Sequence, residues 1–217
     1  MRKTIIITGA MGSGKTEIAL ELAERLAETE PVTLIDLDFV NPYYRSVDKR
    51  GELESTGIRL LAPEHTAIDT PLIADGTHEA ITAPTGTTIV DLGGDPDGAT
   101  IIAQFKEGIN DYDFFAVINF SRITTENLPE TIMLLKAIEQ TGRLKLTGLI
   151  SNTHMKEYTT KDIVLNGLEK CIDLGATLDL PVVLAAATEG IAQEIAGQTF
   201  SVPVLIIKRK LTNIWEI

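Results

Sequence analysis

The chain has 217 residues, of which 44% are hydrophobic and 23% are charged. This size and composition are typical of a soluble domain with a large core, and no apolar run approaches the roughly 20 residues needed to span a membrane. The formal net charge of −12 excludes broad nucleic-acid binding, because an acidic surface repels phosphate backbones. The single cysteine, Cys171, excludes an internal disulfide and favours a cytoplasmic location.

The strongest motif follows a short apolar strand predicted over residues 3–8. Residues 9–16 have the pattern G-x-x-x-x-G-K-T and precede a helix predicted over 14–28, the context of a phosphate-binding P-loop. Its glycines let backbone N–H groups converge on an anion, Lys15 adds charge towards the outer phosphates, and Thr16 can bind Mg²⁺. We therefore expect nucleotide contacts from Gly9, Gly12, Ser13, Gly14, Lys15, Thr16 and Glu17.

Aspartates mark the ends of two further predicted strands. The strand after Pro31 ends in Asp36 and Asp38, and an apolar strand that begins near residue 87 ends in Asp91. In a P-loop protein, an aspartate at such a strand end can hold Mg²⁺ through water. Since ligands of doubly wound sheets bind beyond the carboxyl ends of the strands, we expect these aspartates to gather around the P-loop.

Two segments between these strands allow more than one interpretation. Residues 39–46 contain Asn-Pro, two tyrosines and Arg45, and predict either a packed surface loop or a switch that contacts a partner. Residues 47–86 predict a strand near 58–61 together with short helices or a hairpin. They form either an insertion or a second-site segment within one nucleotide-binding domain over residues 1–217.

Strands and helices alternate through the rest of the chain. This alternation predicts an α/β fold, with a doubly wound, mostly parallel sheet of about seven or eight strands and helices on both faces. The expected helices cover residues 96–109, 129–140, 160–174 and 190–196, and the expected strands cover 114–120, 146–151, 181–185 and 202–208.

These motifs resemble the CobQ/CobB/MinD/ParA nucleotide-binding domains among the P-loop ATPases, over essentially the whole chain. The resemblance is carried by residues 9–16, 35–38, 89–95 and 150–152. It implies that Lys15 bridges the β- and γ-phosphates and that Thr16 binds Mg²⁺ directly. Asp36 and Asp91 would hold the same ion through waters, and Asp38 would orient or activate the attacking water.

The resemblance also implies how the protein senses and selects its nucleotide. Gly94 and Asp95 lie in a segment similar to the switch that senses the γ-phosphate, and Asn152 would hydrogen-bond the adenine edge. The sequence after Asn152 lacks the acidic residue that GTP-binding relatives use to read guanine, so ATP is favoured. The chain departs from ParA and MinD at Ala10, where they carry an additional lysine; Arg45 is our candidate for a substitute cation.

The motifs support three functions to different degrees. The first is an Mg²⁺-dependent ATPase that acts as a nucleotide switch on a client protein, slowly without that partner, as a monomer or a homodimer and without nucleic acid or membrane. The alternative is a small-molecule kinase or an ATP-dependent carboxylate ligase of the dethiobiotin-synthetase type, with its acceptor pocket in residues 40–80. The third is a scaffold that binds nucleotide without hydrolysing it.

Overall fold

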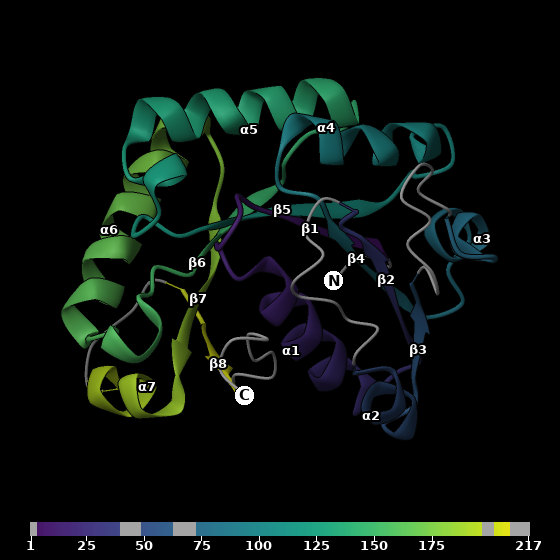
Figure 1. The fold of residues 1–217 in the computed structure, drawn as a ribbon, viewed down its shortest axis with the longest axis horizontal. Helices are drawn as coiled ribbons and strands as arrows, with labels where there is room; N and C mark the ends of the chain where they lie inside the picture. Colours follow the sequence, from purple (N-terminus) through teal and green to yellow (C-terminus); the bar gives the residue numbers. More distant parts are fainter. Residues whose placement is uncertain (1–3, 40–48, 63–72, 197–201, 209–217) are drawn as a thin grey trace.

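The computed structural model describes residues 4–39, 49–62, 73–196 and 202–208 (Figure 1). Within these residues, eight strands form one sheet in which every neighbouring pair is parallel. The α/β fold predicted from sequence is confirmed, with a sheet that is entirely parallel. The strands are β1 (Thr4–Thr8), β2 (Val32–Leu37), β3 (Ile58–Leu61), β4 (Thr87–Leu92), β5 (Tyr112–Ile118), β6 (Gly148–Ser151), β7 (Val182–Thr188) and β8 (Val204–Ile207).

The strand order places β1 in the middle of the sheet. The order is β3-β2-β4-β1-β5-β6-β7-β8. After β1, strands β2 to β4 therefore lie on one side of it and strands β5 to β8 on the other. A crevice opens beyond the carboxyl ends of the strands where such a reversal occurs. The loop that leaves β1 therefore lies at the switch point of the fold.

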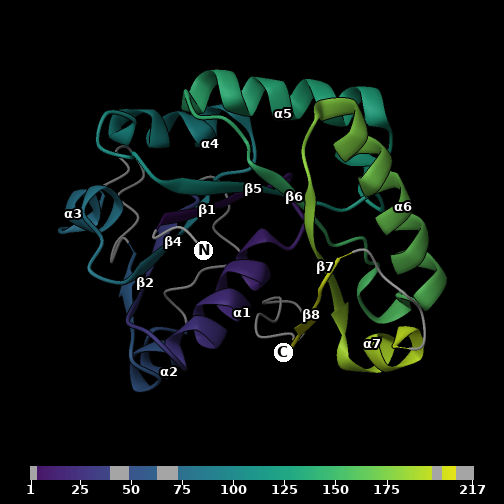
Figure 2. The same cartoon turned by 180° about the vertical axis from the view of Figure 1, so that it is seen from behind.

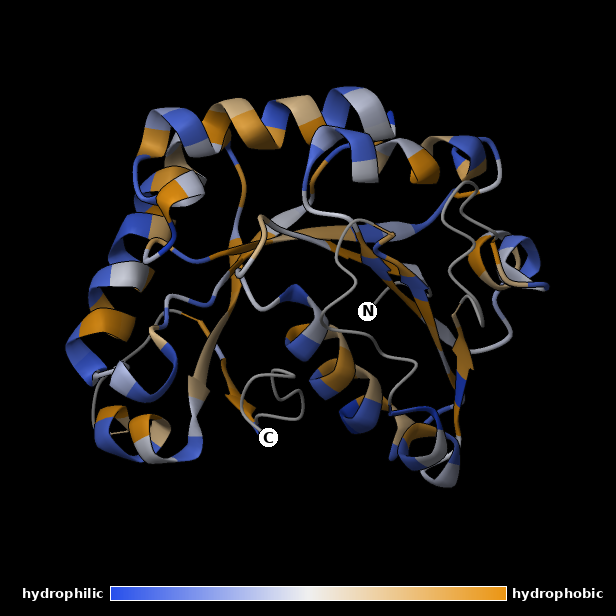
Figure 3. Ribbon diagram, viewed as in Figure 1, coloured by the Kyte–Doolittle hydropathy of each residue, from blue (hydrophilic) through white to orange (hydrophobic). Residues whose placement is uncertain are grey.

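Helices cover both faces of the sheet, on two separate hydrophobic clusters. One cluster includes Ile5, Ile7 and Ile18 and packs under α1, and the other includes Ile6, Phe114 and Leu135 and packs under α4 and α5. Figures 1 and 2 show α1 and α5 on opposite faces, and the apolar sides of the helices turn towards the strands in Figure 3. The helices are α1 (Lys15–Ala27), α2 (Arg50–Ser55), α3 (Thr77–Thr82), α4 (Pro96–Ala99), α5 (Leu128–Gly142), α6 (Lys161–Leu178) and α7 (Glu189–Ile195).

Several predicted elements differ from the observed ones in their bounds, and for two of them the cause is local. The helix expected over residues 96–109 is only α4 followed by the 3₁₀ helix η2 (Thr100–Phe105), because Gly98 and the β-branched residues that follow it are weak helix formers. The strand expected from residue 146 begins at Gly148, since the Leu146 N–H donates to the Glu139 carboxylate instead of to a neighbouring strand.

Of the segment from 47 to 86, for which the sequence allowed more than one interpretation, the structure describes residues 49–62 and 73–86. It contains α2, β3 and α3, as the sequence predicted for its strand and short helices. β3 pairs in parallel with β2 at the edge of the sheet, and so does not form a hairpin. In the described part of the chain, no helix is both long enough and apolar enough to cross a membrane.

The packing of α6 on the end of β6 gives a first prediction. Gly167 of α6 lies against Thr153 so closely that a Cβ there would overlap the threonine side chain, whereas a Cβ on Gly190 of α7 would meet nothing within 4 Å. We expect Gly167→Ala to lower the free energy of unfolding by roughly 1 to 3 kcal/mol. Gly190→Ala, the matched control, should raise it by up to about 1 kcal/mol. Urea unfolding measures both, and equal effects would contradict the close packing.

Candidate nucleotide-binding site

The P-loop runs from the end of β1 into the first turn of α1. Gly14 precedes the helix with a φ of 86°, a left-handed conformation that glycine adopts without the steric penalty of a Cβ. Lys15 and Thr16 begin the helix, so their backbone N–H groups are among those that no helical carbonyl can accept. An anion in the loop would therefore meet free donors and the positive end of the helix dipole.

Three aspartates reach the site from the neighbouring half of the sheet. Asp36 on β2 and Asp91 on β4 are register partners, so they lie side by side on the same face. Asp38 follows β2, and its backbone N–H donates to Asp36 Oδ1 at 3.1 Å. The parallel register thus concentrates negative charge at the carboxyl edge of the sheet, as the sequence predicted.

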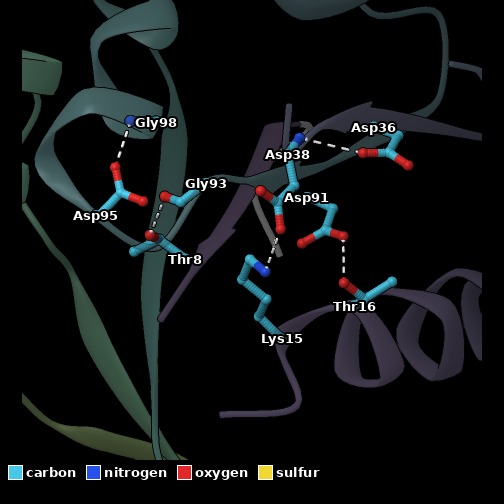
Figure 4. Close-up of polar contacts among 9 residues, drawn as sticks. All are labelled: Thr8, Lys15, Thr16, Asp36, Asp38, Asp91, Gly93, Asp95 and Gly98. Carbon is cyan, nitrogen blue, oxygen red and sulfur yellow. Dashed lines mark hydrogen bonds and ion pairs between the residues drawn. The ribbon is translucent and has the colours of Figure 1, made fainter. Parts of the chain in front are cut away.

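The P-loop side chains contact these aspartates directly (Figure 4). Lys15 Nζ donates to Asp38 Oδ2 at 2.5 Å, and the two side chains are only 6% and 5% exposed. Thr16 Oγ1 donates to Asp91 Oδ2 at 2.7 Å. The structure therefore brings together Lys15, Thr16, Asp38 and Asp91.

Burial and mutual repulsion change how these groups titrate. Burial raises the pKa of Asp91 to about 7, and repulsion from Asp36 and Asp38 acts in the same direction, against the attraction of Lys15. For Lys15, burial alone would lower the pKa, but the carboxylates of Asp91, Asp38 and Asp36 together outweigh it and raise the pKa. Lys15 therefore stays protonated, and Asp91 is an aspartate of the cluster whose pKa is raised.

The oxygen atoms of the cluster suit Mg²⁺, which prefers hard oxygen ligands. Asp91 Oδ1 is buried and has no hydrogen-bond partner among the described residues, so it can act as an acceptor towards a cation. The described residues contain no group of three or more His, Cys, Asp or Glu placed to hold a metal by themselves.

The loop after β4 lies close to the start of the P-loop. A Cβ on Gly94 would overlap the Gly9 carbonyl oxygen, so only glycine permits this approach. Thr8 Oγ1 also donates to the Gly93 carbonyl at 2.9 Å. Asp95 instead turns towards α4, where its carboxylate accepts from the Gly98 N–H at 2.7 Å and caps the helix.

Asn152 lies at the site, with its amide directed at the P-loop. Its Nδ2 donates to the Ser13 carbonyl at 2.7 Å, and the residue is buried. This contact gives Asn152 a role in shaping the loop; its contact with adenine stays a prediction. Glu17 lies half-buried in the first turn of α1, and Arg45 lies outside the described residues.

Two residues at the site were not singled out from the sequence. Asn119 Nδ2 and Arg122 Nε both donate to the Gly12 carbonyl, at 3.2 Å and 3.0 Å. Both follow β5, which pairs with β1. The sequence prediction placed Asn119 inside a strand over 114–120, whereas β5 ends at Ile118, so that Asn119 follows its strand as Asn152 follows β6.

Comparison with known proteins identifies the fold. No family model and no curated protein matches the sequence. Among solved structures, the cell division protein FtsY of Thermotoga maritima has 18% identity and a TM-score of 0.58 over 87% of this chain and 62% of that one. The nucleotide-binding protein of Archaeoglobus fulgidus, solved with ADP, has 15% identity and a TM-score of 0.56 over 88% of this chain and 84% of that one.

A third structure extends the comparison. The signal recognition particle 54 kDa protein of Aeropyrum pernix, solved with GDP, has 16% identity and a TM-score of 0.53 over 82% of this chain and 40% of that one. The chain thus spans less than two thirds of the FtsY and 54 kDa proteins. At these identities the likeness establishes the α/β fold alone; membership of the CobQ/CobB/MinD/ParA type stays a prediction.

The raised pKa of Asp91 predicts a pH-dependent change in stability of the metal-free protein. The pKa is about 7 in the folded state and 3.8 for an ordinary aspartate, so the folded state binds more protons and the wild type loses stability as the pH rises from about 4 to 7. Asp91→Asn removes this loss. We expect the gain in free energy of unfolding to be larger at pH 8 than at pH 5, by roughly 1 to 3 kcal/mol.

The exposed Asp173 on α6 provides the control for this experiment. Asp173→Asn should shift the free energy of unfolding by less than about 0.5 kcal/mol at either pH. Chemical unfolding of both variants at pH 5 and pH 8, with chelator present, measures the difference. A pH-independent gain for Asp91→Asn would show that the buried charge is not its source.

Proposed function

We propose that this chain binds ATP with Mg²⁺ and hydrolyses it, and that its nucleotide state changes its affinity for a client protein. The observation that carries the proposal is the buried cluster in which Lys15 and Thr16 of the P-loop contact Asp38 and Asp91. In this proposal Lys15 binds phosphate, Asp91 is a metal ligand and Asp38 orients water. Lys15 contacts Asp38, and its neighbour Thr16 contacts Asp91. Perturbed pKa values cluster at functional sites, so the raised pKa of Asp91 supports this proposal.

The ion pair between Lys15 and Asp38 suggests how ATP would act on the protein. With Asp38 bonded to it, Lys15 is partly neutralised, so entering phosphates must compete with this carboxylate. Once ATP occupies the loop, Lys15 would turn to the β- and γ-phosphates and release Asp38 to orient the attacking water. The water oxygen would then bond to the γ-phosphorus while the bond between the γ-phosphorus and the β–γ bridging oxygen breaks. The products are ADP, which keeps the bridging oxygen, and inorganic phosphate.

The remaining groups support this assignment. Thr16, Asp36 and Asp91 would hold Mg²⁺, which neutralises charge on the phosphates during transfer. The close approach of Gly94 to Gly9 places the loop after β4 beside the P-loop, where a γ-phosphate would alter it. Since that loop continues directly into α4, a change there would reach the surface and a client.

ATP is proposed over GTP because of the residues after β6. The sequence from Asn152 to Met155 offers no carboxylate for the amino group of guanine. The solved structures do not decide this point, since one similar protein was solved with ADP and another with GDP. Competition of unlabelled ATP and GTP for a fluorescent ADP analogue tests the preference, and stronger competition by GTP would contradict it.

Removing the carboxylate of Asp38 should affect binding and hydrolysis in opposite directions. Asp38→Asn no longer competes for Lys15, so we expect Mg-ADP to bind roughly 5- to 30-fold more tightly, corresponding to about 1 to 2 kcal/mol. Hydrolysis should fall by about 100-fold or more, because the group that orients water is lost. Calorimetric titration and a phosphate-release assay measure the two quantities on the same preparation.

Two further variants complete this experiment. Lys15→Ala should weaken Mg-ADP binding by at least about tenfold, while Asp173→Asn on α6 should leave both quantities unchanged. Phosphate release by Asp38→Asn at the wild-type rate would contradict the proposed role of Asp38. Transfer of the γ-phosphate to an added metabolite, with no release to water, would instead support the kinase or ligase alternative.

A further inference from the structure

The outward-facing carbonyl of Gly12 is held by two side chains from one loop. Asn119 Nδ2 donates to it at 3.2 Å, and Arg122 Nε donates to it at 3.0 Å. Gly12 lies at the exposed tip of the P-loop. The contacts therefore attach this tip to the segment that follows β5.

Asn119 is itself fixed in orientation. It is fully buried, and its Oδ1 accepts from the backbone N–H groups of Ser121 at 3.0 Å and His154 at 3.2 Å. Its Nδ2 also donates to the His154 carbonyl at 3.2 Å. With two donors facing Oδ1, the amide cannot be reversed without losing these bonds, so Nδ2 must face Gly12.

Arg122 brings a positive charge that no described carboxylate pairs with. Arg25 and Arg50 form ion pairs with Glu21 and Glu54, whereas no described carboxylate lies within ion-pair distance of Arg122. Its side chain lies against the Cα of Gly12, where a Cβ would come to 3.0 Å from Nε. In a chain of net charge −12, this places a cation next to the loop proposed to bind phosphate.

Peptide geometry connects these contacts to anion binding. The C=O and N–H of a planar trans peptide point in opposite directions, so holding the Gly12 carbonyl fixes the N–H of Ser13. That N–H closes a turn on the Ala10 carbonyl at 2.9 Å, and Asn152 holds the next carbonyl, that of Ser13, at 2.7 Å. Two consecutive peptides are thus oriented, which directs the N–H of Gly14 away from Asn152.

We propose that Asn119 and Arg122 are positioning residues that hold the P-loop tip in its phosphate-binding shape, with Arg122 also adding positive potential there. This rests on the proposed function, because it requires the loop to bind nucleotide phosphate. A loop held in shape before binding loses less conformational entropy when the ligand arrives, so the effect should appear mainly in affinity. Substitution of Asn119 would also break its hydrogen bonds to Ser121 and His154, so the test uses Arg122.

The experiment compares three variants in Mg-ADP titration and steady ATP hydrolysis. Arg122→Met keeps the aliphatic packing on Gly12 and removes the donor and charge, so we expect binding to weaken about tenfold, the range for a charge-assisted hydrogen bond. KM should rise by a similar factor while kcat changes less than about threefold, since β-phosphate contacts act equally before and during the reaction. Arg122→Lys should recover most of the affinity, because a lysine can still reach the carbonyl.

Arg143→Met is the matched control, since this arginine is exposed at the opposite end of α5 and should leave binding unchanged. Without nucleotide, Arg122→Met should melt within about 2 °C of the wild type, as for a surface change. Wild-type affinity in Arg122→Met, a fall in kcat alone, or no recovery in Arg122→Lys would overturn the inference. A wild type that binds no nucleotide at all would instead refute the proposed function, before any variant is compared.

Discussion

The structure around the nucleotide site depends on a concentration of buried negative charge. The register of β2 and β4 places Asp36 beside Asp91, and Asp38 lies two residues further on. Within the described site, Lys15 bonds directly to Asp38, while burial, aided by repulsion from Asp36 and Asp38 and opposed by Lys15, raises the pKa of Asp91 to about 7. A cation beside Asp91 would offset this concentration of carboxylates, which fits the Mg²⁺ of the proposed function.

The sheet supplies the rigidity that this charge cluster needs. β1 and β4 are buried along their whole length, with hydrophobic clusters on both faces. The aspartates at the strand ends are therefore held close together, and burial, with their mutual repulsion, raises the pKa of Asp91. The same rigid edge holds Thr16 against Asp91 across the start of α1.

Much of this site could be predicted from sequence because its parts are local. The P-loop is a continuous pattern, and Asp36 and Asp91 each end a recognisable apolar strand. Asn119 and Arg122 were missed because their role depends on the pairing of β5 with β1, which no local pattern specifies. The helix expected over 96–109 was partly wrong because regular apolar spacing does not reveal that Gly98 and its β-branched neighbours favour a shorter α-helix and a 3₁₀ turn.

β1 lies between two groups of side chains, the aspartates that follow or end β2 and β4 and the asparagines that follow β5 and β6. Those suited to the chemistry, Asp36, Asp38 and Asp91, all come from strands on one side of β1, whereas Asn119 and Asn152, which hold the loop, come from the other. Under the proposed function, substitutions in one half of the sheet would modify hydrolysis while the P-loop keeps its shape. The fold is in this sense modular, and a new catalytic activity could evolve in it by changing the strand ends of one half alone.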